Sequence, residues 1–227
     1  MMKVYENILV NNDCYRSGKN IKPTGIVVHS TGCNQKKVAV FLKSWNKSGV
    51  SVCVHGFIGV LEDGKIGIVQ TLPWTHRCWG VGSGKKGSYN NSHIQFEICE
   101  DDLTDVAYFN EVFYHAATLC AFLCRSFNLS TESIVSHAEA HRKGYATNHA
   151  DCDHWLKKFG KTMQDFRKEV KTMIEIQNTV KNMIQDGVTT EENRDSWEMF
   201  LSGQAEMNPE FVRIILNRYH ERLGETK

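Results

Sequence analysis

A change in hydrophobic spacing near residue 104 is the feature that most constrains the fold of this chain. Before it, short apolar runs rich in β-branched residues occupy 24–32, 52–72 and 93–100, and such runs predict strands. The run at 52–72 contains "EDGK", a hairpin turn signal. After residue 104, apolar side chains recur every three or four residues, which is typical of amphipathic helices. The chain is therefore predicted to contain a mixed α/β domain followed by helices.

The apolar spacing predicts four helices from that point onward, at 104–123, 162–183, 191–201 and 209–223. Thr104 is the predicted N-cap of the first helix, and Thr162 with Asp165 forms a capping-box pattern at the start of the second. The stretch "QDGVTT" separates the second helix from the last two. We therefore predict two regions, a mixed α/β domain at 1–175 and a C-terminal helical region at 176–227.

Charge and composition exclude several classes of protein. The formal net charge is +1 and no dense block of Lys or Arg is present, so strong electrostatic binding to nucleic acid or anionic lipid is not expected. The net charge is still compatible with a local basic patch on the folded surface. No apolar run approaches the ~18 residues that cross a bilayer, and no secretory signal is visible at the start. We therefore expect synthesis in the cytoplasm, no membrane insertion, and eight cysteines that are mostly buried free thiols.

The segment 134–155, "IVSHAEAHRKGYATNHADCDHW", is rich in histidine and also contains two aspartates. It offers His137 directly after a short apolar stretch, and His149 and Asp151 follow twelve and fourteen residues later. His29 closes a predicted buried strand. Two imidazoles and one carboxylate, with a fourth position left for water, form a common open zinc site. The alternative is a polar surface loop and a hydrogen-bonded strand-end histidine, but the combination favours a metal site.

Four stretches, taken in order, resemble the zinc-dependent N-acetylmuramoyl-L-alanine amidases, whose type-2 amidase fold is shared with peptidoglycan recognition proteins. These stretches are "GIVVHSTG", "WTHRCWGVGSGKKGSYNNSHIQFEICED", "VSHAEAH" and "ATNHADCDHW". The resemblance covers residues 25–160, and it is specific because all four match in order and spacing. It implies a central mixed β-sheet flanked by helices, and Zn²⁺ as the cofactor.

The resemblance also implies roles for individual residues. His29, His137 and Asp151 match the zinc ligands of the family. Cys152 is an open alternative to Asp151 as third ligand, because a thiolate also suits zinc. We prefer Asp151 because His149 then lies two residues before it, where the family has its second catalytic residue. Glu97 in "FEICED" matches the catalytic acidic residue, and its alternative is a strand glutamate in a surface ion pair.

The sequence departs from the family pattern at two places. Many relatives have a proline directly after the third ligand, where this chain has Cys152. Many also have an active-site histidine near Gly80, whereas His76 lies slightly earlier here. His76, Trp74 and Trp79 are the candidates to line an open groove for a polymer substrate. The alternative for each tryptophan is a place in the core.

By this resemblance the chain is a hydrolase of bacterial peptidoglycan. It would use zinc-activated water to cleave the amide bond between the lactyl group of N-acetylmuramic acid and L-alanine of the stem peptide. The main alternative is a peptidoglycan-binding module of the same fold without activity, and a histidine-metal nuclease is disfavoured because no basic block is present. The resemblance suggests a phage or prophage endolysin that acts on the cell wall after release. For 176–227, wall binding, homo-oligomer formation and a structural role all stay open.

Overall fold

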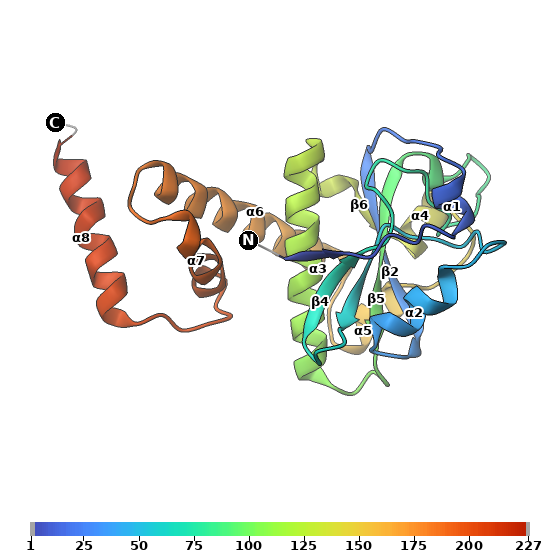
Figure 1. Ribbon diagram of the computed structural model, residues 1–227, viewed down its shortest axis with the longest axis horizontal. Coiled ribbons are helices and arrows are strands. Elements are labelled where there is room, and N and C mark those ends of the chain that lie inside the picture. The colour runs from blue at the N-terminus through green and yellow to red at the C-terminus, as the bar shows by residue number, and fades with distance from the viewer. Residues whose placement is uncertain (1–2, 226–227) are drawn as a thin grey trace. The chain divides into compact units, whose positions relative to one another are not determined.

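The computed structural model describes residues 3–225 of the chain. These residues divide into two compact units, 3–170 and 171–225, and each is described by itself. The larger unit contains a β-sheet with helices on both of its faces, and the smaller unit is helical (Figure 1).

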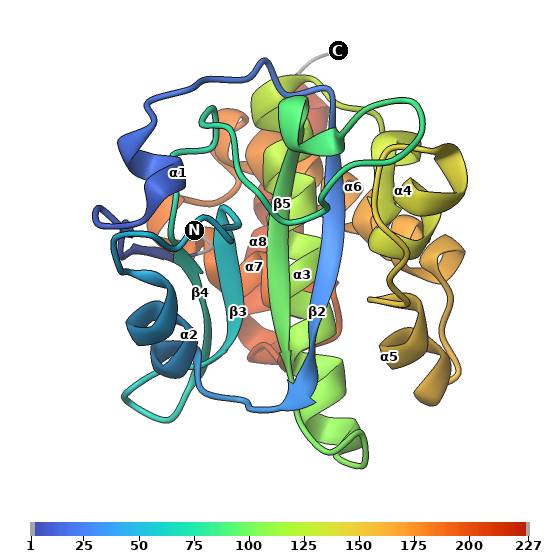
Figure 2. The same cartoon turned by 90° about the vertical axis from the view of Figure 1, so that its right-hand side faces the viewer.

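Within the described residues, a six-stranded sheet with the order β1-β4-β3-β5-β2-β6 forms the centre of the larger unit. The strands are β1 Val4–Glu6, β2 Gly25–Asn34, β3 Gly56–Val60, β4 Ile66–Gln70, β5 His93–Glu100 and β6 Ile134–Ser136. Strands β3 and β4 are antiparallel, as the hairpin signal predicts, and the other neighbouring pairs are parallel. The expected mixed sheet is confirmed, and Figure 2 shows β2 beside β5 at its centre.

Helices cover both faces of this sheet. The helices of the larger unit are α1 Asp13–Arg16, α2 Val38–Trp45, α3 Val106–Phe127, α4 His137–Lys143, α5 Asp153–Lys158 and the first part of α6 Met163–Gln185. In Figure 1, α3 lies on one side of the sheet, and α1 and α2 lie on the other. Because both faces are covered, the first six residues of β2 are buried without alternation, as in parallel sheets generally.

The prediction that the buried strand ends at His29 is wrong. Strand β2 continues to Asn34, because its pairing with β5 resumes at Asn34 and Glu100 after a register shift beyond Ser30. His29 therefore lies inside a central strand and pairs with Glu97 of β5, whereas the pairing of β2 with β6 ends one residue earlier, at Val28. The prediction of Thr104 as N-cap is also wrong, because Asp105 caps α3 by accepting the Tyr108 N–H, and the helix begins at Val106.

The long helix α3 supplies much of the core on its face of the sheet. Its buried side chains recur at helical spacing, and they include Phe109, Val112, Phe113, Ala116, Leu119, Cys120 and Leu123. Phe109 packs on Trp155 of α5 with ring centroids 4.6 Å apart, and Phe113 meets Phe166 of α6 edge to face. At the start of α6, the predicted capping box of Thr162 and Asp165 is confirmed by reciprocal hydrogen bonds.

The smaller unit contains the end of α6, helix α7 Arg194–Leu201 and helix α8 Pro209–Glu225. Trp197 is its buried centre, and its indole N–H donates to Thr189 Oγ1 at 3.1 Å. Phe200 and Phe211 pack on this indole with ring centroids about 6 Å away. The predicted helix at 191–201 begins with a 3₁₀ turn, Glu191–Asn193.

All eight cysteines lie within the described residues and are free, and each is buried except Cys33. The expectation of mostly buried free thiols is therefore confirmed, with one exception.

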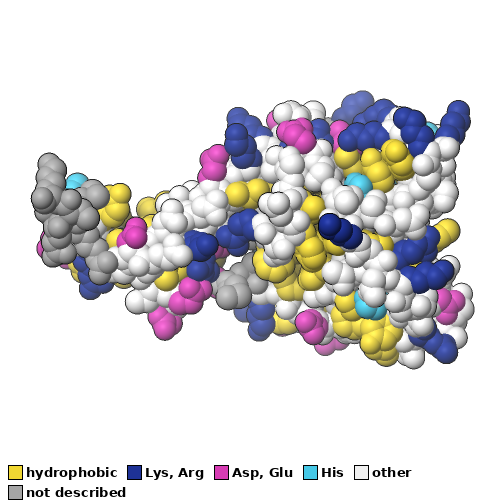
Figure 3. All heavy atoms as spheres, turned by 90° about the horizontal axis from the view of Figure 1, so that it is seen from above, with side chains coloured by type: hydrophobic (Ala, Val, Ile, Leu, Met, Phe, Trp, Pro, Cys, Tyr) yellow, Lys and Arg dark blue, Asp and Glu magenta, His cyan; other side chains and the backbone are white. Residues whose placement is uncertain are grey.

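Among residues 3–225, no helix has the length and apolar character that a bilayer crossing requires. On the surface, Lys and Arg side chains gather along one margin of the larger unit in the view of Figure 3.

Candidate metal centre and catalytic groove

Four elements bring the predicted site residues together. His29 lies in β2, and Glu97 is its direct register partner in β5. His137 is the first residue of α4, which follows β6 without a loop because Ser136 acts as N-cap. Asp151 lies in the short loop before α5. The two central strands and the start of a capped helix therefore fix three of these four residues on regular structure.

The donor atoms of His29, His137 and Asp151 converge on one point. Nδ1 of His29 lies 2.8 Å from Oδ2 of Asp151, and Nδ1 of His137 lies 3.5 Å from the same oxygen. The two Nδ1 atoms are 3.2 Å apart. In a tetrahedral zinc site with bonds of 2.0–2.1 Å, ligand atoms lie about 3.3 Å from one another. The observed spacing therefore fits ligands of a single ion.

Hydrogen bonds on the far side of each imidazole ring fix which nitrogen faces this point. Nε2 of His29 lies 3.1 Å from the carbonyl Oε1 of Gln95, which can only accept. Nε2 of His137 lies 3.4 Å from Thr147 Oγ1, and that hydroxyl donates to the Val81 carbonyl. Both rings therefore carry a proton on Nε2 and direct Nδ1 toward Asp151, an arrangement common for metal-ligating histidines.

The charges at this point also suit a cation. Burial lowers the pKa of His29, but the hydrogen bond to Asp151 and the charges of Glu97 and Asp151 outweigh it, so the pKa is raised. Burial raises the pKa of Asp151, yet its hydrogen bonds to His137 and His29 hold that pKa well below the usual range. Asp151 is therefore held as a carboxylate where the three donor atoms meet, and this point attracts positive charge.

Glu97 is half-buried beside this cluster. Among the described residues, no group hydrogen-bonds its buried Oε2. Burial, and after it the negative charges of Asp151 and Glu100, raise the pKa of Glu97 to about 7, although the charge of His29 opposes them. A carboxyl group with a pKa near 7 can accept and return a proton at neutral pH, which general acid–base catalysis requires.

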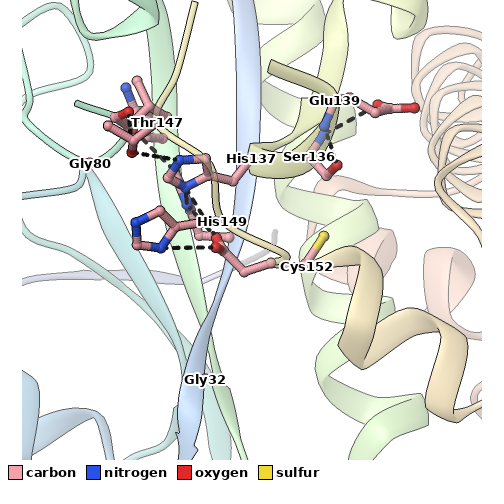
Figure 4. Close-up of polar contacts among 12 residues, drawn as sticks. Gly32, Gly80, Ser136, His137, Glu139, Thr147, His149 and Cys152 are labelled. Atoms are coloured by element: carbon pink, nitrogen blue, oxygen red, sulfur yellow. Dashed lines mark hydrogen bonds and ion pairs between the residues drawn. The ribbon is translucent and has the colours of Figure 1, made fainter. Parts of the chain in front are cut away.

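The structure separates the two candidates for the third ligand. Asp151 reaches the two histidines, whereas the buried Cys152 places its sulfur 3.7 Å from the sulfur of Met163 in α6. In Figure 4 the sulfur of Cys152 points away from the rings of His137 and His149.

The His149 ring stacks on His137 with centroids 4.7 Å apart, and its side chain is 61% exposed. His149 is therefore the group of this set that solvent reaches most easily.

A cavity of about 440 Å³ opens over the cluster. It is lined by His29, Ser30, Thr31, Gly32, Gly80, Glu97, His137, His149, Ala150, Asp151 and His154. Sequence analysis missed His154, whose Nε2 lies 3.0 Å from Oε1 of the buried Glu100. Its place within the histidine-rich segment was the available signal. The same Glu100 oxygen accepts the Gly32 N–H, so His154 and the end of β2 share one anchor.

The three residues predicted to contact substrate do not line this cavity. Trp74 is half-buried, and its ring lies 6.2 Å from that of His55. His76 stacks on Tyr15 at 5.8 Å. Trp79 is 40% exposed, with the Arg77 guanidinium 4.9 Å from its ring. The structure therefore does not bring Trp74, His76 and Trp79 to the metal cluster, and their contact with substrate stays a prediction.

The glycine-rich loop at 80–82 is attached to both imidazoles through side chains that sequence analysis missed. Gln95 Nε2 donates to Asn90 Oδ1, which also accepts the N–H groups of Gly80 and Val81. Thr147 donates its N–H and its hydroxyl to the Val81 carbonyl. A Cβ on Gly80 would collide with Oε1 of Gln95. The available signal was spacing, since Gln95 lies two residues before Glu97 and hence on the same strand face.

Comparisons with known proteins agree with this architecture. The family model described as N-acetylmuramoyl-L-alanine amidase matches residues 19–154. No curated protein matches the sequence.

Several solved structures share the fold. The Staphylococcus aureus hydrolase AmiA in complex with its ligand is 21% identical, with a TM-score of 0.60, covering 82% of this chain and 85% of that chain. PlyL is 20% identical, with a TM-score of 0.60 and coverage of 74% and 97%. A mutant endolysin from Bacillus subtilis is 22% identical, with a TM-score of 0.57 and coverage of 75% and 99%. Because the family match spans more than half of the sequence, the chain belongs to the N-acetylmuramoyl-L-alanine amidase family.

Proposed function

We propose that this amidase of bacterial peptidoglycan is zinc-dependent, with His29, His137 and Asp151 as the ligands and Glu97 and His149 as catalytic residues. The bond cleaved joins the lactyl group of N-acetylmuramic acid to L-alanine of the stem peptide. The observation that carries the proposal is the convergence of two Nδ1 atoms and one carboxylate oxygen, with each Nε2 held by a separate partner.

The donor set favours zinc over harder cations. Calcium and magnesium prefer six or more oxygen ligands, whereas two imidazoles and one carboxylate leave a tetrahedral ion one open position. Asp151 is the acidic member that the structure brings to both histidines. Cys152 is buried against Met163 and would have to leave this contact to act as a ligand. These contacts support Asp151 as the third ligand.

The residues around the cluster suit hydrolysis of an amide. When bound, zinc lowers the pKa of a coordinated water from ~15.7 to about 7. Glu97, whose pKa is raised to about 7, accepts a proton from the attacking water and transfers it to the leaving amine of L-alanine as the C–N bond breaks. His149 lies at the exposed rim beside Asp151, where its N–H can donate to the carbonyl oxygen as negative charge develops there.

Metal analysis and wall cleavage on matched variants test this assignment. We expect Asp151→Ala to lose zinc and activity, because the carboxylate contacts both histidines. Glu97→Gln keeps zinc, and its release of new L-alanine amino groups from purified wall falls by about 10²- to 10⁴-fold. Cys152→Ser keeps both properties. Loss of zinc in Cys152→Ser together with retention in Asp151→Ala would reverse the choice of ligand.

The remaining parts of the proposal concern the setting of this activity. Residues 1–175 form the catalytic domain, and 176–227 form a helical extension that binds wall, mediates oligomer formation or has a structural role. Exposed apolar side chains of that extension, such as Met199, Leu201 and Leu216, support contact with another surface. Light scattering on the full chain checks for a homo-oligomer. We also propose that the protein acts on the cell wall as a phage or prophage endolysin.

A further inference from the structure

Two segments beside the metal-site cavity are joined by backbone hydrogen bonds. The N–H of Lys86 donates to the Gly144 carbonyl at 2.8 Å, and the N–H of Tyr89 donates to the Tyr145 carbonyl at 3.1 Å. The aliphatic stem of Lys86 lies against Gly144, where an added Cβ would sit 3.1 Å from Lys86 Cγ. The lysine-bearing loop and the end of α4 therefore form one continuous surface.

Lysine and arginine side chains supply the charge of this surface. It contains one cavity of about 710 Å³ and another of about 600 Å³, and Lys86 and Lys143 line both. Lys85 lines the larger cavity as well. Among the described residues, no Asp or Glu lines either cavity. Because the whole chain carries a formal charge of only +1, this is a local excess of positive charge.

Within the part of the chain that the structure describes, these lysines form no ion pair. None of the ion pairs found within residues 3–225 includes Lys85, Lys86 or Lys143. Arg142, which also lines the larger cavity, differs because it pairs with Asp153 at 3.4 Å. Three exposed ammonium groups are thus available to a ligand, on a backbone that hydrogen bonds hold in place.

The lysine surface adjoins the reaction site. Thr147 lines the larger cavity, and its hydroxyl lies 3.4 Å from Nε2 of His137. His137 in turn lines the metal-site cavity. A residue of the larger lysine-lined cavity is therefore in direct contact with a residue that lines the metal-site cavity.

We propose that Lys85, Lys86 and Lys143 form an anion subsite that binds carboxylate or phosphodiester groups of the bacterial wall next to the bond being cleaved. This inference rests on the proposed function, because it takes the wall polymer as the occupant of the neighbouring cavity. Two wall components carry such anions: the stem peptide carries carboxylates, and phosphate polymers attached to the wall carry phosphodiesters. Contacts of this exposed kind are weak singly and are screened by salt.

Binding to purified walls tests the subsite. The triple variant K85Q/K86Q/K143Q is compared with K43Q/K47Q/K65Q, which removes three exposed lysines from α2, the segment after it and the β3–β4 turn and changes the net charge equally. Both sets are made in full-length Glu97→Gln protein, so that the wall is not consumed. We expect the subsite variant to bind intact wall about tenfold more weakly at low salt and to lose most of the salt dependence. The control set should bind as the parent does.

The source of the anion is decided by a second wall preparation, from which acid has removed the phosphate polymers. If the subsite variant binds more weakly to intact wall only, the bound anions are the phosphodiesters. If its affinity falls equally for both wall preparations, the bound anions are the carboxylates of the stem peptide. Equal binding of the subsite and control variants overturns the proposal. Lys143→Gln alone, with its melting temperature measured, provides the decisive comparison if the triple variant is unstable.

Failure of the proposed function has a separate signature. Wild-type protein is assayed for zinc content and for cleavage of a muramoyl-L-alanine substrate whose carboxyl group is capped as an amide. Absence of zinc and of cleavage there contradicts the proposed function. The lysine comparison still decides whether wall anions bind at this surface.

Discussion

His29 in β2 and His55, which directly precedes β3, are both buried, yet their surroundings differ. His55 uses both nitrogens within the fold: Nε2 donates to the His76 carbonyl at 2.8 Å, and Nδ1 accepts the Gln95 N–H at 3.0 Å. His29 is held on one side by the Gln95 side chain and directs its other nitrogen at His137 and Asp151. Burial of a histidine alone therefore does not indicate a metal site. A buried ring nitrogen that points at a second potential ligand does indicate one.

Acid–base behaviour separates the two histidines in the same way. Burial lowers the pKa of His55 to about 4, and its hydrogen bonds to the backbone of His76 and Gln95 oppose this only in part. The pKa of His29 is raised, since Asp151 and Glu97 outweigh the effect of burial. One histidine is thus a neutral structural group, and the other attracts positive charge.

The largest expected effect is on zinc-dependent stability. With free zinc about a thousandfold above its Kd, zinc should raise the free energy of unfolding of the wild type by about 4 kcal/mol. His29→Ala should lose this gain because a ligand is missing. His55→Ala should keep it, although the loss of its two hydrogen bonds lowers stability by about 1–3 kcal/mol. Urea unfolding with zinc or with a chelator measures both. A zinc-dependent gain retained in His29→Ala would contradict the assignment.

The second effect is the pH dependence of metal-free stability. The unfolded chain protonates His55 near its ordinary pKa of about 6.5, whereas the folded chain does so only near 4. The stability linked to neutral His55 is therefore complete above pH 6.5 and is lost as pH falls toward 4, by about 3 kcal/mol. His93, whose pKa burial and then Lys143 lower to about 4, adds a loss of the same sign. Unfolding with chelator across this range should show a shallower slope in His55→Gln than in the wild type.

The third effect concerns the support of His29. Gln95→Leu removes the acceptor for Nε2 and should weaken zinc affinity by about 10- to 100-fold, as loss of an outer partner does elsewhere. Gln70→Leu is the matched control, because Gln70 is also a buried glutamine, but it donates to the Leu72 carbonyl. Competition with a chromogenic chelator measures both affinities. Equal affinities in the two variants would show that the Gln95 contact only stabilises the fold.

The smallest effect is expected at Thr147. Its hydroxyl lies 3.4 Å from Nε2 of His137, a longer contact than the 3.1 Å between His29 and Gln95. Thr147→Val should therefore weaken zinc affinity less than Gln95→Leu does, by less than about tenfold. Thr147→Ser, which keeps the hydroxyl, should match the wild type. A larger loss in Thr147→Val than in Gln95→Leu would reverse the order of the two supports.

The candidate ligands were proposed from local patterns in the sequence, whereas the mixed sheet was implied by the family resemblance. His29 follows a β-branched run, and His137 and Asp151 share one histidine-rich segment. The end of β2 was misjudged, since its continuation depends on pairing with β5 beyond Ser30. Spacing along the chain does not reveal a register shift between two strands.

The outer partners of the ligands were not predicted for a related reason. Gln95 meets His29 across 66 positions, and Thr147 meets Val81 across the same number. Neither contact leaves a periodic signal, because each depends on where the loop at 80–82 lies. Conversely, Trp74 and Trp79 were chosen for the chemistry of their rings, but the backbone places them away from the cluster.

The hydrogen bonds that attach the 80–82 loop to both imidazoles couple ion binding at the cluster to polymer binding in the groove. Val81 is held by Asn90 on its N–H and by Thr147 on its carbonyl, and these side chains connect onward to the two ligand rings. A polymer that displaces this loop while occupying the groove must loosen the ion, and removal of the ion must then strengthen the binding of that polymer by the same factor. Metal titrations with and without wall fragments would then yield one shared coupling constant.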